Sequence, residues 1–141
     1  MIEEVLRGIE AALDEEWLLF ERDDDEDALR ISFKSEGARY FAIAYRDDPT
    51  FVMIGSGWTL PDDVEFLQAL RVANRLNARK KLVKVAIWEE ERDVLFTIET
   101  LAATGDEIQQ HIERVVDVLR DTAQNFFNAL TSGEDEPESP P

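Results

Sequence analysis

The chain has 141 residues, the size of one domain with its own core, and its 44% hydrophobic and 33% charged residues are usual for a folded protein. Its 32 acids against 15 lysines and arginines give a formal net charge of −17, which disfavours general binding to nucleic acid or to anionic membrane surfaces. The absence of cysteine excludes disulfides, thiolate catalysis and cysteine metal sites.

Residues 2–15 predict an amphipathic helix. Apolar side chains recur there at spacings of three and four, with charged side chains between them. The apolar positions are Ile2, Val5, Leu6, Ile9 and Leu13. Neither a signal peptide nor an apolar run long enough to span a membrane is recognisable, so we expect a cytoplasmic protein with no membrane contact.

A short strand and an acidic loop are expected next. Residues 17–20 favour the strand, and residues 23–27 are five consecutive acids that must stay in water. Such a run resembles a calcium loop in charge, but it lacks the glycine and the distal glutamate of an EF-hand. A solvated turn is therefore the favoured interpretation.

Three strands joined by short turns are predicted over residues 29–34, 39–45 and 51–58. Leu29, Ile31 and Phe33 alternate with polar residues, which is typical of a strand with one buried face. The turns fall at residues 35–37 and 47–49, so the three strands form an antiparallel meander.

A second helix is predicted over residues 61–79, because Pro61 suits the first turn of a helix. Its buried stripe is expected to comprise Phe66, Leu70, Ala73, Leu76 and Asn77. A second hairpin follows, and its strands are predicted over residues 82–89 and 94–101.

The closing segment predicts a long amphipathic helix that continues without a break to Leu130. Thr104 and Glu107 have the spacing of a capping box at its start. Apolar residues then keep helical spacing at Ile108, Ile112, Val115, Val116, Leu119, Ala123, Phe126 and Leu130. Residues 132–141 contain four acids and three prolines, so we expect a disordered tail there.

These elements predict one α+β domain over residues 1–131. Their order, α-β-β-β-α-β-β-α, gives an antiparallel sheet of five or six strands with three helices. Three motifs accompany this order: Asn74-x-x-Asn77 at the end of the second helix, the hairpin over residues 83–101, and Phe126-Phe127 in the closing helix.

In this order and these motifs the chain resembles the YbjN family of bacterial sensory transduction regulators, whose fold is similar to that of type III secretion chaperones. The resemblance brings no catalytic residues. It implies a non-enzymatic cytoplasmic protein, often a homodimer, that acts as a regulator or as a chaperone for a protein or peptide partner. The alternative is a dedicated type III secretion chaperone that holds an effector segment.

Asn74 and Asn77 end the second helix, where asparagine can cap the helix or anchor a neighbouring strand by bonding to its backbone. Capping or anchoring is the favoured interpretation, and direct contact with a ligand is the alternative.

Six of the 15 basic residues lie between positions 71 and 84, with no acid among them: Arg71, Arg75, Arg79, Lys80, Lys81 and Lys84. They can offset the helix dipole, or receive acids of a second subunit or of the chain's own tail. Binding of an acidic protein partner is the second interpretation, and nucleic-acid binding is the least favoured.

Apolar residues fall on both faces of the predicted sheet, while three helices can cover only one face. We expect the second face to bind a partner or a second copy of the chain. Phe51, Met53 and Trp88 are the residues selected for this surface, although burial in the core is the favoured interpretation for each.

No group of residues predicts catalysis, a metal site or a cofactor site. His111 is the only histidine, so it has no second imidazole with which to hold a metal or to activate a nucleophile. Carboxylates at residues 89–91 and 93 lie in a turn, where the desolvation that acid–base chemistry needs is hard to arrange, so a solvated turn is the favoured interpretation.

Overall fold

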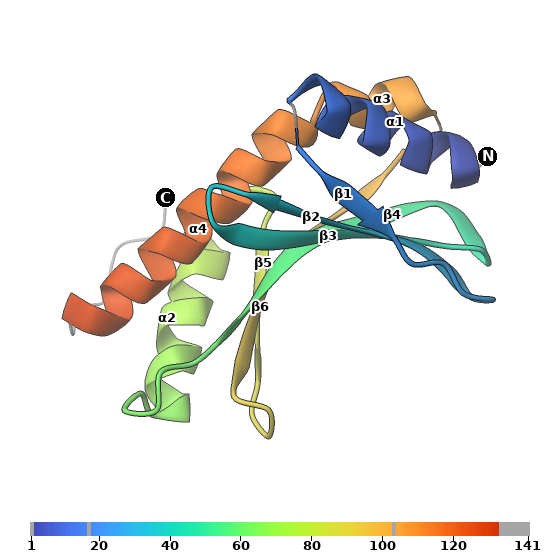
Figure 1. Cartoon of the computed structure of the whole chain (residues 1–141). Coiled ribbons are helices and arrows are strands. Elements are labelled where there is room, and N and C mark those ends of the chain that lie inside the picture. Colours follow the sequence, from blue (N-terminus) through green and yellow to red (C-terminus); the bar gives the residue numbers. More distant parts are fainter. Residues whose placement is uncertain (1, 17, 103, 133–141) are drawn as a thin grey trace.

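The computed structural model describes residues 2–16, 18–102 and 104–132 and has the predicted α+β class, with a six-stranded sheet and four helices in these ranges (Figure 1). The elements in chain order are α1 (Ile2–Glu15), β1 (Phe20–Arg22), β2 (Ala28–Ser35), β3 (Ala38–Tyr45), β4 (Asp48–Thr59), α2 (Phe66–Arg79), β5 (Lys84–Trp88), β6 (Asp93–Leu101), α3 (Gly105–Gln109) and α4 (Ile112–Ser132). The predicted tail, apart from Ser132, lies outside the described residues.

The strands follow the order β1-β2-β3-β4-β6-β5, and every neighbouring pair is antiparallel. The pairing of β3 with β4 ends at Phe41 and Gly55, whereas β4 stays paired with β6 as far as Thr59 and Asp93. The end of β4 therefore extends past β3. Beyond this point the β2–β3 hairpin separates from the ribbon of β4, β6 and β5.

One face of the sheet packs against helices, and the core lies between them. The helix α1 contacts β2 and β3, α4 contacts β4 and β6, and α2 contacts β5 and α4. Alternate strand residues point into this layer, as predicted for Leu29, Ile31 and Phe33, which are all buried. Phe96 of β6 meets Phe126 of α4 edge to face, with ring centroids 5.5 Å apart.

The prediction of one unbroken closing helix from residue 105 is wrong. The structure has two helices there, α3 and α4, with a break at Gln110 and His111. The break lets α3 turn aside and pack against α1. Gly8 and Gly105 allow this contact, since a Cβ atom at Gly8 would lie 2.2 Å from the carbonyl oxygen of Gly105. At the start of α3, the hydroxyl of Thr104 accepts the backbone N–H of Glu107, which is half of the predicted capping box.

The predicted start of the second helix at residue 61 is also wrong, because α2 begins at Phe66. The N–H of Val64 donates to the carbonyl oxygen of Pro61 to close a turn. The guanidinium of Arg92 then donates to the carbonyl oxygens of both residues, at 2.8 and 2.7 Å. These bonds hold the carbonyl groups away from the helical direction, so Glu65, in an extended conformation, becomes the N-cap.

The buried stripe of α2 differs from the prediction by a partial rotation. Ala69, Val72 and Ala73 are buried, Leu76 is half-buried, and Leu70 is exposed. Small residues at the contact let α2 lie close to both β5 and α4. The predicted strands at residues 17–20 and 82–89 also have other bounds, because β1 pairs with β2 only from Phe20 and the positive φ of 73° at Leu82 delays β5 to Lys84.

Candidate interaction surface

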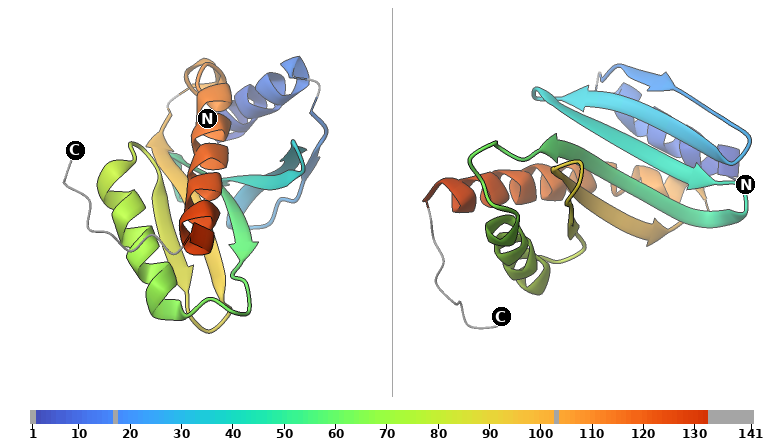
Figure 2. Two further views of the ribbon diagram at one scale, coloured as in Figure 1. Left: turned by 90° about the vertical axis from the view of Figure 1, so that its left-hand side faces the viewer. Right: turned by 90° about the horizontal axis from the view of Figure 1, so that it is seen from below.

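The sheet has one face that the described helices leave uncovered, called the open face here. In the right-hand view of Figure 2 the strands lie in front of α1 and α4, so this face is turned toward the viewer. The strand registers place on it every second residue of β3, β4, β6 and β5. Its apolar members are Phe41, Ile43, Tyr45, Phe51, Met53, Leu95, Leu101, Ala86 and Trp88.

The predicted surface residues Phe51, Met53 and Trp88 all lie on this open face. Phe51 and Met53 are half-buried by neighbouring side chains, while Trp88 is 54% exposed. Sequence reasoning missed Leu101, which lies opposite Phe51 and is 74% exposed. The alternation of β6 could have identified Leu101, because every second residue of a strand points to the same face of the sheet.

Close packing within the open face keeps its aromatic rings down on the sheet. Gly55 faces Phe41 across the β3–β4 pair, and a Cβ atom at Gly55 would lie 2.8 Å from the tip of the Phe41 ring. The ring therefore covers the glycine, as aromatic residues do beside glycines in twisted sheets. Near the opposite end, the rings of Tyr45 and Phe51 lie 5.9 Å apart.

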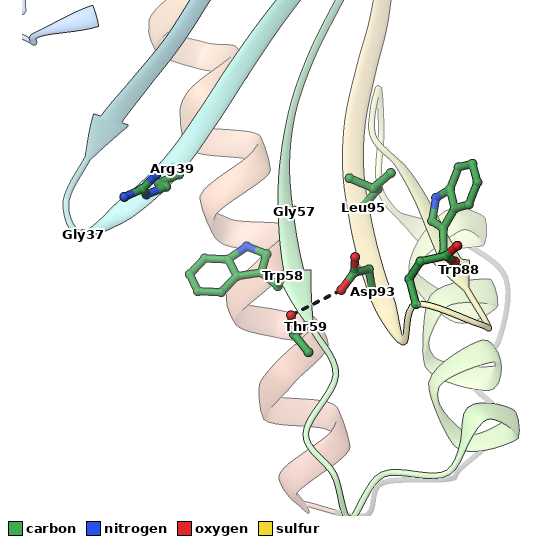
Figure 3. Close-up of a pocket in the computed structure, with 9 residues that line it drawn as sticks. Gly37, Arg39, Gly57, Trp58, Thr59, Trp88, Asp93 and Leu95 are labelled. Carbon is green, nitrogen blue, oxygen red and sulfur yellow. Dashed lines mark hydrogen bonds between the residues drawn. The ribbon is translucent and has the colours of Figure 1, made fainter. Parts of the chain in front are cut away.

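A trough crosses the open face where the β2–β3 hairpin separates from the end of β4. It consists of two adjoining hollows, of about 620 and 660 Å³, that share Arg39 and Gly57. Figure 3 shows the first hollow, with Arg39 on the hairpin side and Trp88 and Leu95 on the β5–β6 side. The second hollow continues past Phe41 and Ser32 to Glu21 and Leu19 at the β1 edge.

The helix α4 holds both walls of the trough in place. Its Arg120 lies 3.2 Å from a carboxylate oxygen of Glu36 and donates to the hydroxyl of Ser35, so it fixes the tip of the β2–β3 hairpin. On the other wall, Trp58 meets Phe127 of α4 edge to face with ring centroids 5.8 Å apart. The trough is therefore built on a packed support, as a preformed binding surface requires.

Charged side chains of both signs border the apolar centre of the open face. Arg39 and Lys34 lie on the hairpin side, while Glu91 and Asp93 lie on the β5–β6 side. Lys84 pairs with Glu99 at 2.7 Å across the two last strands. The open face therefore combines apolar side chains with charges of both signs.

The two asparagines of the sequence motif differ in their surroundings. The side chain of Asn77 donates to the carbonyl oxygen of Val85 at 3.0 Å and accepts the N–H of Val85 at 2.7 Å. This is the strand-anchoring contact of the favoured interpretation. Asn74 is exposed on α2, one turn earlier.

The basic residues Arg71, Arg75 and Arg79 lie away from the open face, on one flank of α2. Spacings of four residues align them along the helix, and Gln68 precedes them on the same flank. Lys80 pairs with Asp121 of α4 at 2.6 Å, whereas Lys84 belongs to the open face. The predicted basic patch thus divides between two surfaces.

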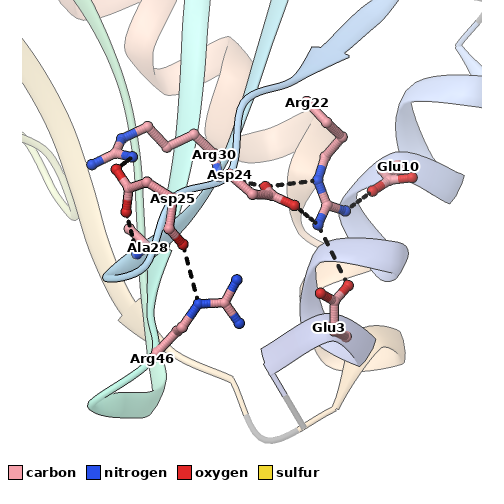
Figure 4. A network of polar contacts seen from close by, with 8 residues as sticks. All are labelled: Glu3, Glu10, Arg22, Asp24, Asp25, Ala28, Arg30 and Arg46. Atoms are coloured by element: carbon pink, nitrogen blue, oxygen red, sulfur yellow. Dashed lines mark hydrogen bonds and ion pairs between the residues drawn. The ribbon is translucent and has the colours of Figure 1, made fainter.

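The acidic loop of residues 23–27 is exposed, as predicted, but two arginines order it (Figure 4). Arg22 bonds Asp24 at 2.9 Å and also pairs with Glu3 and Glu10 of α1. Its hydrogen bond lowers the pKa of Asp24 below the ordinary value and raises the pKa of Arg22. Arg30 lowers the pKa of Asp25 in the same way.

His111 lines a smaller hollow of about 370 Å³, together with Glu99, Glu107 and Arg114. Within residues 2–16, 18–102 and 104–132, no three histidine or carboxylate side chains are grouped to hold a metal ion. Nor does any helix in these ranges have the length and apolar character needed to cross a bilayer.

Comparisons with known proteins agree with the fold. The family model YbjN, described as "Putative bacterial sensory transduction regulator", matches residues 6–132. A crystal structure of an uncharacterized protein from Methanothermobacter thermautotrophicus is similar over 89% of this chain and 99% of that chain, with a TM-score of 0.63 and 13% sequence identity. A search of curated proteins gave no match.

Proposed function

The chain belongs to the YbjN family, and from this membership and its open sheet face we propose that it is a non-enzymatic regulator that binds a protein or peptide partner on that face. The observation that carries the proposal is the row of apolar side chains on the open face. Trp88 and Leu101, on the last two strands of the sheet, expose 54% and 74% of their surface. Burial of such side chains against a partner is favourable because it removes apolar area from water.

The trough favours a partner segment in an extended conformation. It crosses several strands and opens at the β1 edge, near Leu19 and Glu21, so a chain could lie along it without ending inside a closed pocket. Holding such a segment is the chaperone form of the proposed role. A second copy of this chain is the alternative occupant of the open face, which would make the protein a homodimer.

Two single substitutions and a matched control test the proposal. Trp88→Ser and Leu101→Ser each remove an exposed apolar side chain from the open face. Leu67→Ser removes a side chain of similar exposure, 55%, from α2 instead. We expect the first two variants to lose partner proteins captured from the source cell, and the Leu67 variant to retain them at wild-type levels.

Light scattering over a concentration series separates the two occupants. If the full chain is a dimer that the Trp88 or Leu101 substitution converts to a monomer, a second copy occupies the open face. If all variants are monomeric and only capture is lost, another protein occupies it. Equal capture and equal mass in all three variants would contradict the proposed role of this face.

A further inference from the structure

The sheet has strand edges inside it as well as at its rim. Within the part of the chain that the structure describes, β3 and β4 pair only as far as Phe41 and Gly55. Beyond this point residues 38–40 of β3 pair with β2 alone, and residues 56–59 of β4 pair with β6 alone. The space between these two segments is called the fork here. The trough lies over it, because Arg39 and Gly57 line both hollows.

The backbone groups that face the fork from β4 belong to Gly57 and Thr59. The N–H of Leu60 donates to the carbonyl oxygen of Arg92 at 2.7 Å, and the register between β4 and β6 is regular from there back to residue 51. Even-numbered residues of β4 therefore direct their backbone groups toward β6, and odd-numbered residues direct theirs toward β3. Gly57 and Thr59 are exposed, and β3 has already diverged where they lie.

This edge of β4 is held in place for one more strand. Trp58 packs against Phe127 of α4 on the helix side, and β6 supports the other edge of the same residues. An unpaired strand edge is a template for an extended chain, since it offers N–H and C=O groups at regular spacing. Gly57 and Thr59 together offer two donors and two acceptors.

Gly57 leaves a space above this edge that resembles the space above Gly55. The ring of Phe41 covers Gly55, whereas a Cβ atom at Gly57 would meet within 4 Å only the side chain of Leu95, at 3.2 Å. An aromatic residue opposite Gly57 on an added strand would repeat the arrangement of Phe41 over Gly55. Its ring would also lie on the side of Arg39, whose guanidinium attracts an aromatic face.

The end of the fork beside Thr59 is acidic. Residues 59–65, which continue β4, contain three acids, and residues 88–93 at the neighbouring β5–β6 turn contain four acids and one base. Glu91 and Asp93 line the first hollow, as Figure 3 shows for Asp93. A cationic side chain opposite Thr59 therefore meets carboxylates. A second copy of this chain, with its net charge of −17, is repelled instead.

From these observations we propose that the fork binds an extended segment of another protein as an additional strand, antiparallel to β4. The segment exchanges backbone hydrogen bonds with Gly57 and Thr59, in the orientation that gives the more stable pairing. It carries an aromatic residue opposite Gly57 and a lysine or arginine two residues earlier, opposite Thr59. This binding mode rests on the function proposed above and specifies the partner's conformation and side chains.

The probe for this binding mode is the peptide Ser-Thr-Lys-Val-Phe-Thr, capped at both ends. We expect it to bind the full chain and to slow amide hydrogen exchange at Gly57 and Thr59. The amides of Ser56 and Trp58, which face β6 with or without the peptide, are the internal control and should change little. Binding without protection of Gly57 and Thr59 would overturn strand addition.

Methylation of single peptide nitrogens identifies the hydrogen bonds. Methylation at the lysine or the phenylalanine removes an N–H that faces β4, so it should weaken binding about fivefold or more. The valine nitrogen between them faces away from β4, and its methylation is the matched control, expected to change the Kd by less than about twofold. Equal losses at all three positions would contradict the alternation of a paired strand.

The space above Gly57 is tested by filling it. Gly57→Leu should weaken peptide binding about tenfold or more, because the new side chain occupies the place of the phenylalanine ring. Ser32→Leu adds the same side chain at an exposed position of β2 on the same face of the sheet, and it should leave the Kd unchanged. Thermal unfolding of both variants checks the fold. Equal binding by the two folded variants would overturn the placement of the ring.

The acidic end of the fork is tested by a change on each molecule. The double variant Glu91→Gln with Asp93→Asn should bind the peptide about two- to fivefold more weakly. The loss should vanish for a peptide with glutamine in place of lysine. The same loss for both peptides would contradict the pairing of the cation with these carboxylates.

Light scattering with and without the peptide identifies the natural occupant. A dimer of the full chain that the peptide dissociates would place a second copy in the fork and overturn the proposal. Absence of peptide binding to a monomeric chain would overturn it too. The proposed function would survive either result if the Trp88 and Leu101 variants still lost their captured partners, so the two failures are distinguishable.

Discussion

The side chain of Asn77 makes to Val85 both hydrogen bonds that a neighbouring strand would make. Its Oδ1 accepts the Val85 N–H at 2.7 Å, and its Nδ2 donates to the Val85 carbonyl oxygen at 3.0 Å. The strand β5 is the last in the sheet, so this backbone pair faces outward from the sheet edge. Asn77 thereby attaches α2 to the sheet and closes part of an edge that could otherwise pair with another chain.

Replacing Asn77 with alanine is expected to destabilise the fold by about 1–3 kcal/mol, because it leaves two partly buried backbone groups without their partner. Asn74→Ala is the matched control. It removes an exposed asparagine from the same helix and should change stability by less than about 0.5 kcal/mol. Urea unfolding of the two variants measures the difference, and equal midpoints would show that the Val85 contact adds nothing.

The close contact between α1 and α3 determines whether Gly8→Ala stabilises or destabilises the fold. Alanine normally favours a helix over glycine by about 1 kcal/mol, so Gly8→Ala should stabilise α1 taken alone. In the folded chain the new Cβ atom would meet the Gly105 carbonyl oxygen at 2.2 Å, which is backbone and cannot move aside alone. We expect a net loss of about 1–3 kcal/mol in thermal or urea unfolding. A stabilised variant would mean that α1 and α3 separate easily.

The layers of this fold could be predicted because alternation and helical spacing report burial directly. Ile2 to Leu13 predicted the bounds of α1, and the alternation at Leu29, Ile31 and Phe33 identified the covered face. The same alternation placed Phe51, Met53 and Trp88 on the other face. The trough could not be predicted, because it depends on where the pairing of β3 with β4 ends, and that point is set by twist over long range.

The two wrong predictions of helix bounds, at residue 61 and at residue 110, have a common cause. In each case a tertiary contact acts against a local preference. Pro61 favours a helix start, but the hydrogen bonds from Arg92, 31 residues away, hold the turn open. The apolar spacing around Ile108 continues through the break at residue 110, since both α3 and α4 bury the same side of the chain. Sequence spacing detects the buried side, and it does not detect a change of direction.

The pairing of Arg22 with Asp24 predicts a pH-dependent contribution to stability. The folded state lowers the pKa of Asp24 below its ordinary value of 3.8, so the contribution is complete above that value and is lost as the pH falls through the lowered pKa. Arg22→Gln should therefore be less stable than wild type at neutral pH, and the difference should shrink in acid. Arg7→Gln, which replaces an exposed arginine of α1, is the control.

Urea unfolding at neutral pH and at several values below 3.8 measures this difference. The carboxylate is exposed, so the effect at neutral pH should stay below about 1 kcal/mol. An NMR titration should also show the pKa of Asp24 rising toward its ordinary value in the Arg22 variant. A constant difference between wild type and variant at all pH values would assign the effect to packing of the arginine stem instead.

Arg120 joins α4 to the hairpin wall of the trough through Glu36 and Ser35, so its replacement should loosen that wall. Replacing Arg120 with methionine keeps most of the apolar stem and removes both polar contacts to the hairpin, together with the pair that the arginine makes with Asp117 of its own helix. We expect a global destabilisation of about 1 kcal/mol or less, but a clear rise in hydrogen exchange at residues 35–39, since only the hairpin tip loses its support. Arg114→Met, an exposed residue of the same helix, should change neither quantity. Partner capture provides the functional measurement. If the trough holds the partner, the Arg120 variant should keep its overall fold and capture less protein. Unaltered capture by a variant with a loosened hairpin would restrict the interaction to the Phe51 and Leu101 end of the open face.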